Sequence, residues 1–254
     1  MKKILYQLAA AITFFTRIPG WKIIEIPVEN YARIIYLWPL TGWLTGGIMA
    51  VAWLGFSRLF PPILAIILAL TVRILLTGGL HEDGLGDFFD GFGGGKTKSD
   101  VLRIMKDSQV GSYALIGVII YYLLLVNTLI SLPGKLVFTV MIAADPFSKL
   151  LTAMMMNFLP YARTESESKS KTLYDKLTIS KFLIACLFGL VPLLFFLKPV
   201  LWFSVVLPVG LLLFLFYYVK KRIGGYTGDV CGATALLYEL SFYLAVCLIT
   251  RNYS

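Results

Sequence analysis

The chain contains 254 residues, of which 58% are hydrophobic and 15% are charged, whereas about a quarter of the residues of soluble domains are charged. A soluble domain of this size could not bury so much apolar side chain, so the composition excludes a soluble globular enzyme and a disordered chain. It predicts an all-α polytopic bundle in a lipid bilayer, with residues 1–254 forming a single domain. The net charge of +9 is typical of basic cytoplasmic loops, and no nucleic-acid partner is expected.

The first 19 residues have features of a secretory signal, because Lys2 and Lys3 precede an apolar stretch. However, no small-x-small cleavage site follows, and the apolar residues recur at helical spacing. This pattern predicts a retained helix that lies in the membrane interface.

Seven apolar segments follow, each near the ~20 residues that span a hydrocarbon core. They cover residues 34–56, 63–80, 112–132, 136–159, 179–197, 200–219 and 231–250, and they predict about seven transmembrane helices. Charged residues well inside these segments are costly in lipid and are expected to face the interior of the bundle. Asp145 and Lys149 lie four residues apart and can pair. Arg73 can pair with a carboxylate or point toward the acidic stretch described below, and Glu239 lies in the last segment.

The basic residues predict the orientation of the chain. The connections before the first segment and after the second, fourth and sixth contain 17 of the 23 Lys and Arg residues, whereas the alternate connections and the C-terminus contain four. Cytoplasmic loops are enriched in Lys and Arg. We therefore expect a multi-pass protein of the cell (inner) membrane, with its N-terminus in the cytoplasm and its C-terminus outside.

The most unusual stretch, GGLHEDGLGDFFDGFGGG at residues 78–95, lies at the predicted cytoplasmic end of the second segment. Asp83, Asp87 and Asp90 are spaced i, i+4, i+7 and would share one face of a helix. Because like charges on one face repel one another, the spacing favours a bound cation, and oxygen ligands favour Mg²⁺. Gly84 and Gly91 fall on or near this face and would leave space for a bulky group. The alternative interpretation is a solvated acidic loop.

His81 and Glu82, which precede Asp83 directly, are less specific indicators of function. His81 is the single histidine of the chain. It could help to ionise an attacking hydroxyl or could simply bond a carboxylate, and the residues alone leave both roles open. Glu82 would point about 100° away from Asp83 on a helix.

A second polar patch contains Asp100, Arg103, Lys106 and Asp107. Asp100, Arg103 and Asp107 would share a helical face. They form either an exposed salt-bridge face, which contributes little, or part of a substrate site in which Lys106 or Arg103 holds a phosphate near the metal.

A third patch, GGYTGD at residues 224–229, precedes the last segment on the same predicted side of the membrane. A Gly-rich turn before a helix can bind an anion through its backbone N–H groups, and it can equally be an ordinary turn. Gly228 and Asp229 are the candidates for substrate contact in this patch.

Five stretches of the chain resemble cobalamin synthase, the adenosylcobinamide-GDP ribazoletransferase family. They occur in the family's order over nearly the whole chain: FFTRIP at 14–19, TGGLHEDGLGDFFDGFGGG at 77–95, IMKDSQVGSY at 104–113, YAR at 161–163 and GGYTGDVCGA at 224–233. The glycine-aspartate stretch is highly specific, and the other four support it. Glu82 stands where the family usually has an apolar residue and adds a candidate ligand, and TESES follows YAR in place of a glycine-containing turn.

The resemblance implies a transferase of the last stage of cobalamin biosynthesis. The hydroxyl of α-ribazole, or of its phosphate, would attack the cobinamide-side phosphorus of adenosylcobinamide-GDP, giving adenosylcobalamin or its 5′-phosphate and GMP. Such a diphosphate cleavage needs a cation on the phosphate oxygens, here Mg²⁺. The metal ligands would be Asp83, Asp87 and Asp90, with Glu82 and Asp229 as further candidates. His81 would be a base or orienting group, and Lys106 and Arg103 would hold phosphate.

The rival interpretations are another membrane Mg²⁺-dependent phosphotransferase or prenyltransferase, and a cation transporter. A CDP-alcohol phosphotransferase would need Asp-Gly-x-x-Ala-Arg, and an aromatic prenyltransferase would need two separate Asp-rich motifs, which the sequence lacks. A transporter would place its carboxylates near the bilayer midplane, whereas the charge map places them at the cytoplasmic edge. A homo-oligomer and an association with other cobalamin-assembly enzymes both stay open.

Overall fold

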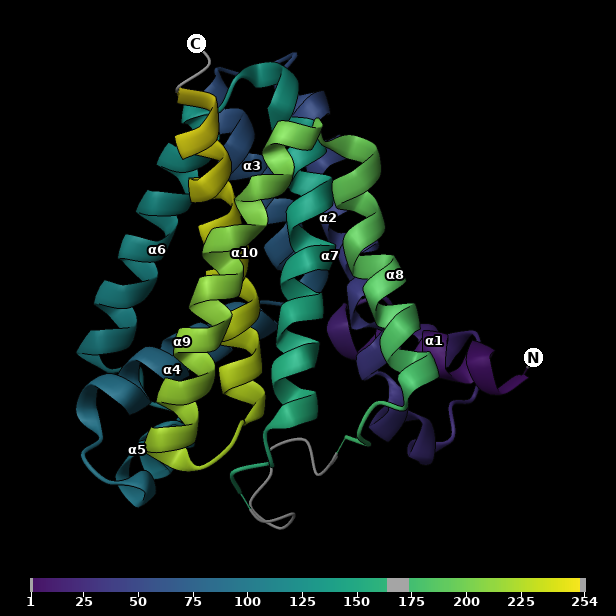
Figure 1. Ribbon diagram of the computed structural model, residues 1–254, viewed down its shortest axis with the longest axis vertical. Helices are drawn as coiled ribbons and strands as arrows, with labels where there is room; N and C mark the ends of the chain where they lie inside the picture. The colour runs from purple at the N-terminus through teal and green to yellow at the C-terminus, as the bar shows by residue number, and fades with distance from the viewer. Residues whose placement is uncertain (1, 164–173, 252–254) are drawn as a thin grey trace.

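The computed structural model of the protein describes residues 2–163 and 174–251 (Figure 1). Helices make up all the named elements of these residues, which confirms the all-α prediction. The α-helices are α1 (Lys2–Phe15), α2 (Trp38–Phe56), α3 (Pro62–Thr77), α4 (Leu80–Gly94), α5 (Lys98–Ile104), α6 (Ser112–Ser131), α7 (Gly134–Phe158), α8 (Ile179–Phe196), α9 (Val206–Ile223) and α10 (Gly228–Arg251). Short 3-10 helices join them: η1 (Gly20–Lys22), η2 (Val28–Arg33), η3 (Ile35–Leu37) and η5 (Pro199–Val205). Lys169 and Lys171, two of the basic residues counted in the connection after the fourth predicted segment, lie outside the described residues.

The long helices form a bundle of membrane-spanning size. Among the described residues, six helical segments are long and apolar enough to cross a membrane, and the bent pair α3–α4 makes a seventh candidate. In the most apolar 18-residue stretch of α7, 83% of the residues are buried inside the bundle. The corresponding share for α8 is 22%. This contrast is expected when α7 lies in the core and α8 presents apolar side chains to lipid. The predicted multi-pass membrane bundle is confirmed.

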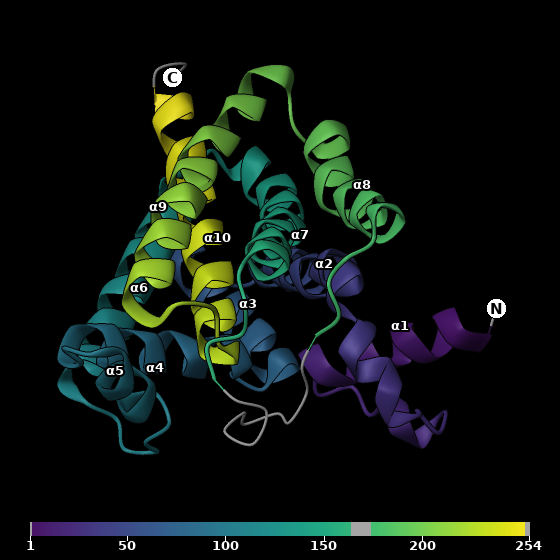
Figure 2. The same cartoon turned by 60° about the horizontal axis from the view of Figure 1, so that its bottom comes forward.

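The second predicted segment, residues 63–80, corresponds to α3 and ends in a bend that was not predicted. α3 ends at Thr77, and α4 begins at Leu80 after a bend of 92°. Gly78 and Gly79 have φ values of 70° and 72°, in the left-handed region where a side chain would be strained. The backbone N–H of Arg17 donates to the last turn of α3 at 2.7 Å and ties the end of α1 to the bend. As a result α4 lies across one end of the bundle (Figure 2).

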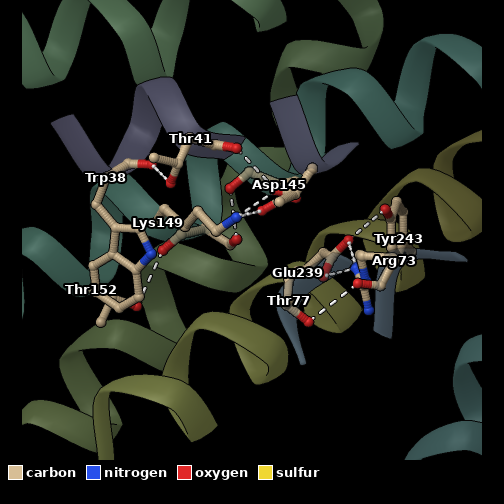
Figure 3. A network of polar contacts seen from close by, with 11 residues as sticks. Trp38, Thr41, Arg73, Thr77, Asp145, Lys149, Thr152, Glu239 and Tyr243 are labelled. Carbon is tan, nitrogen blue, oxygen red and sulfur yellow. Dashed lines mark hydrogen bonds and ion pairs between the residues drawn. The ribbon is translucent and has the colours of Figure 1, made fainter. Parts of the chain in front are cut away.

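The charged residues within the spans face the interior, as predicted (Figure 3). Arg73 of α3 pairs with Glu239 of α10 at 2.6 Å, so Arg73 binds a carboxylate instead of pointing toward the acidic stretch. Lys149 pairs with Asp145, one turn earlier in α7, at 2.7 Å. Tyr243 also donates to Glu239 at 2.7 Å. Each buried charge therefore has an opposite charge beside it, as burial in low dielectric requires.

The expected N-terminal helix is α1. Gln7, Ala10, Ala11 and Phe15 are buried against the rest of the protein, and residues 2–5 are exposed. The position of α1 in the membrane interface stays a prediction.

The connections that are rich in Lys and Arg lie at one end of the bundle. Figure 1 shows α4, α5 and the α9–α10 connection at the lower end and the C-terminus at the upper end. Successive connections between the long helices therefore lie at alternate ends of the bundle, as the distribution of Lys and Arg residues predicts.

Candidate active site

The family-like stretches meet where α4 crosses the start of α10. A Cβ atom on Gly84 would lie 2.8 Å from the backbone oxygen of Asp229, and one on Gly232 would lie 3.2 Å from the Cα of His81. These glycines let the two helices approach backbone to backbone. The prediction that Gly84 leaves room for a bulky group is therefore wrong, because α10 fills that space. The same holds for Gly91, whose open side is filled by α5.

Asp90 holds the start of α6. Its carboxylate accepts hydrogen bonds from the backbone N–H groups of Gly111 at 2.6 Å and Ala114 at 2.8 Å. A carboxylate at this position satisfies free N–H groups of the first turn and interacts favourably with the helix dipole. Asp90 therefore has a structural task that the spacing of the aspartates did not predict.

The predicted aspartate face lines a hollow of about 460 Å³ between α4 and α6, which we call the acidic cleft. Its charged residues are Glu82, Asp83, Asp87, Asp90, Lys106 and Asp107. The three aspartates of α4 thus do share one cleft, as the i, i+4, i+7 spacing predicts.

The acidic cleft suits a metal ion that is shared with a substrate. Among the described residues, no three His, Cys, Asp or Glu side chains are grouped closely enough to hold a metal ion. Mg²⁺ needs no such group, because it usually takes one or two carboxylates and completes its shell with water and substrate phosphate. Asp83 and Asp87 lie one helical turn apart in the cleft, and Oε2 of Glu82 is buried without a hydrogen-bond partner. These side chains fit Mg²⁺, and their role as ligands stays a prediction.

Lys106 connects the acidic cleft with a second hollow, the basic groove. The groove is lined by Thr97, Lys98, Ser99, Leu102, Arg103, Lys106, Ala162 and Arg163. Four cations on one groove favour an anionic ligand. The structure therefore places the two predicted phosphate-binding residues, Arg103 and Lys106, together.

The predicted helical face of Asp100, Arg103 and Asp107 is correct for the first two residues, which form an exposed ion pair at 4.0 Å, and wrong for Asp107. α5 ends at Ile104, so Asp107 lies in the following turn, where it accepts the Gln109 N–H at 3.0 Å. Asp100 forms a capping box with Thr97, the N-cap residue of α5. Hydrogen bonds from Thr97 hold the pKa of the Asp100 carboxyl below its usual range, as expected for a capping box.

On the other side of α4 lies the aromatic pocket, a hollow of about 150 Å³. Its aromatic residues are Phe14, Phe15, Trp38, Tyr161 and Tyr174, and its polar residues include His81, Asp83, Arg163 and Asp229. Burial raises the pKa of the Tyr174 phenol, so this ring stays neutral. Nε2 of His81 is buried and has no hydrogen-bond partner.

Asp229 is held away from the acidic cleft by the segments around it. The backbone of Tyr226 forms two hydrogen bonds with residues 160 and 162, at 2.9 and 2.8 Å. This short bridge brings Arg163 to Asp229, with 3.5 Å between their side chains. Asp229 and Gly228 therefore line the aromatic pocket and not the cleft. Asp83 lines the aromatic pocket as well, and the role of Asp229 as a further metal ligand stays a prediction.

Comparison with known proteins agrees with these motif positions. The family model described as cobalamin-5-phosphate synthase matches residues 7–247. A relative in Shewanella sp. (strain W3-18-1), named adenosylcobinamide-GDP ribazoletransferase, is 36% identical over 94% of this chain and 92% of its own. A relative of the same name in Leptospira interrogans is 35% identical over 94% of each chain. This chain belongs to the cobalamin-5-phosphate synthase family. No solved structure matches it.

Membership of the cobalamin-5-phosphate synthase family confirms the predicted activity class, a transferase of the final stage of cobalamin biosynthesis. The rival interpretations, which were a different phosphotransferase, a prenyltransferase and a cation transporter, lose their support because the match extends over nearly the whole chain.

The residue-by-residue interpretation did not anticipate the aromatic pocket beside the candidate site. Arg163, Phe14 and Phe15 belong to stretches that carried the family resemblance, yet no role was assigned to them. Trp38 was read as part of a membrane span. The sequence shows neither where α1 packs nor that the backbone around Tyr161 pairs with Tyr226. These two features bring Phe14, Phe15 and Arg163 to the pocket that His81 lines. Their inclusion in the FFTRIP and YAR stretches was the available signal.

Gly84→Ala should impair the synthase by separating α4 from α10. The new Cβ would lie 2.8 Å from the Asp229 oxygen, and a displacement of less than about 1 Å at a site can cost on the order of 10- to 100-fold in rate. We expect at least a roughly tenfold loss of kcat/KM in purified protein. Gly94→Ala is the matched control on the same helix, because its Cβ would meet its nearest neighbour at 3.5 Å. Equal losses in the two variants would contradict the close crossing.

Proposed function

We propose that this synthase transfers the adenosylcobinamide phosphate group of adenosylcobinamide-GDP to a hydroxyl of α-ribazole, or of its 5′-phosphate, and releases GMP. The name that the relatives share, adenosylcobinamide-GDP ribazoletransferase, supports these substrates. The position of Asp83 carries the proposal, because Asp83 lines both the acidic cleft and the aromatic pocket. A phosphate held in the cleft and a nucleoside held in the pocket would therefore meet beside Asp83.

We propose Mg²⁺ as the cofactor, held by Asp83 and Asp87 with Glu82 as a further ligand. These residues lie at the same cleft, and Glu82 offers a buried oxygen without a partner. When bound, the ion would offset negative charge on the phosphate oxygens and on the leaving group.

The remaining predicted residues would bind and orient the substrates. Lys106 lies at both the acidic cleft and the basic groove, so it can hold a phosphate of the diphosphate, with Arg103 beside it. His81 lies in the wall of the aromatic pocket and is proposed to accept the proton of the attacking hydroxyl or to orient that hydroxyl. Gly228 and Asp229 would contact the acceptor from the start of α10.

The reaction is tested with purified protein in detergent or lipid, given adenosylcobinamide-GDP, α-ribazole and Mg²⁺. Cobalamin and GMP should form in equal amounts. EDTA should abolish turnover, and added Mg²⁺ should restore it, because carboxylates hold this ion weakly and reversibly. GMP release at an undiminished rate without ribazole would identify a diphosphate hydrolase. Folded protein that released no GMP with both substrates would refute the proposal.

We also propose that the end of the bundle with the active site faces the cytoplasm of an inner membrane. The excess of Lys and Arg at this end supports this orientation. Single cysteines introduced at Lys98 and Lys135 of a cysteine-free variant should react with a membrane-impermeant reagent from opposite sides. Labelling of both positions from the same side would contradict the seven-span topology. Association with a second copy or with other cobalamin-assembly enzymes stays a prediction.

A further inference from the structure

The geometry points to the aromatic pocket as the subsite for the flat, apolar base of the acceptor nucleoside. This assignment rests on the proposed function and adds to it the side of α4 on which the acceptor binds. It distinguishes the acceptor base from the guanine of the donor, which is also a flat aromatic group.

A continuous series of rings leads to His81. Tyr174 and Phe14 are 6.2 Å apart between ring centroids, and Phe14 and Phe15 are 5.0 Å apart. Phe15 stacks on Trp38 at 4.9 Å with an angle of 7° between the rings, and Trp38 stacks on His81 at 6.0 Å. Aromatic side chains that line a site bind bases by stacking, without selecting for a polar edge.

The pocket has the size and polarity for such a base. A cavity of about 150 Å³ with apolar walls can hold an aromatic ring. On the side formed by α1, η3 and the start of α2, the lining residues are Phe14, Phe15, Ile35 and Trp38. The indole N–H of Trp38 is the one polar side-chain group of these four residues, so most donors and acceptors on the edge of guanine would find no partner on this wall, and burying them would be costly. The benzimidazole base of α-ribazole has far fewer hydrogen-bonding groups that need partners.

Three residues that line the pocket have a buried nitrogen atom without a hydrogen-bond partner: Trp38, His81 and Arg163. Nε of Arg163 and Nε2 of His81 are buried without hydrogen-bond partners, in side chains that are 8% and 5% exposed as residues. Buried polar atoms without partners are rare in folded proteins. Hydroxyl or phosphate oxygens on the ribose of a bound nucleoside would satisfy the nitrogens of His81 and Arg163.

The same placement directs the acceptor toward the reaction. Asp83 belongs to the pocket and to the acidic cleft. With the base against Phe14 and Phe15, the ribose would extend toward His81 and Asp83, which lie next to the cleft proposed to hold the diphosphate. The donor's guanosine would then lie outside the aromatic pocket, on the side of the basic groove.

Titration calorimetry of the purified full-length protein with α-ribazole, and separately with GMP, tests the assignment. Phe14→Leu removes a ring but keeps most of the apolar volume, and it should weaken α-ribazole binding at least about tenfold while GMP binding is unchanged. Phe14→Tyr should retain binding because it keeps the ring. Phe195→Leu is the matched control, since Phe195 is 80% exposed on α8, away from the pocket.

In steady-state assays, Phe14→Leu should raise the KM for α-ribazole and leave the KM for adenosylcobinamide-GDP unchanged, whereas Phe14→Tyr and Phe195→Leu should change neither. Unchanged α-ribazole binding in Phe14→Leu, or weakened GMP binding in its place, would overturn the assignment. Calorimetry needs no turnover, so the two proposals fail separately. A wild-type chain that binds α-ribazole through Phe14 but releases no GMP would refute only the reaction.

Discussion

Asp83→Asn and Asp87→Asn are each expected to lower kcat on the order of 100-fold and to leave the bundle as stable as the wild type. Both side chains line the acidic cleft, where a carboxylate would hold Mg²⁺ against the reacting phosphates. An amide has nearly the same shape but lacks the negative charge, and losing one electrostatic contact to a transition state costs about this much. The measurement is GMP release under saturating substrates, at several Mg²⁺ concentrations, together with the thermal unfolding midpoint.

Two comparisons sharpen the expectation for the aspartates. Asp90→Asn should reduce the unfolding midpoint as well as activity, because an amide offers one oxygen where Asp90 accepts from two backbone N–H groups. Asp100→Asn is the matched control, because Asp100 lies outside the cleft and its two hydrogen bonds from Thr97 go to one oxygen, which asparagine keeps. Full activity in Asp83→Asn and Asp87→Asn, with a loss only in Asp90→Asn, would show that the acidic face has a structural role and does not take part in catalysis.

Arg73→Met should be among the most destabilising substitutions in the protein. It would leave Glu239 buried in the bundle without its partner at 2.6 Å, as Figure 3 makes clear. Breaking a buried ion pair by removing one member costs about 3–5 kcal/mol, because an uncompensated charge remains. The free energy of unfolding in a denaturing-detergent titration would measure the loss.

The double variant Arg73→Met/Glu239→Gln provides the internal test of the ion pair. Removing both charges takes away the uncompensated carboxylate, so the double variant should be more stable than Arg73→Met alone. Arg58→Met changes an exposed arginine and should shift the stability by less than about 0.5 kcal/mol. Glu239→Gln is measured alone as well. If the stability loss of the double variant equalled the sum of the losses of Arg73→Met and Glu239→Gln, the two side chains would not be coupled in the folded protein.

The sequence predicts the membrane bundle well, because span length and charge distribution are properties of contiguous segments. Arg73 and Glu239 also follow a simple rule, since a charge inside a span must face the interior. The bend after Thr77 was not predicted. The apolar run gives no signal that it stops there, and only the Gly78-Gly79 pair, with both residues at positive φ, sets the direction of α4.

The candidate site is predictable where its residues share a helix and less so where they do not. The spacing of Asp83, Asp87 and Asp90 correctly places them on one cleft. It could not show that Asp90 accepts hydrogen bonds from the start of α6, because that contact joins residues more than 20 positions apart in the chain. Helical spacing also failed for Asp107, because α5 ends before it. Periodicity assumes that a helix continues, and the sequence around residues 104–107 has no proline to stop it.

The shortness of α3 bears on the depth of the active site. At ~1.5 Å per residue, the 16 residues of α3 rise about 24 Å, which is less than the ~30 Å thickness of a typical hydrocarbon core. The bilayer must thin around α3, or the α3–α4 bend must lie below the surface of the hydrocarbon. In either case α4 would lie close to the boundary between the hydrocarbon and the headgroups, and not above the headgroups. Anionic headgroups would then be the nearest competitors for Lys106 and Arg103, and the lipid composition of the membrane would set how strongly they compete.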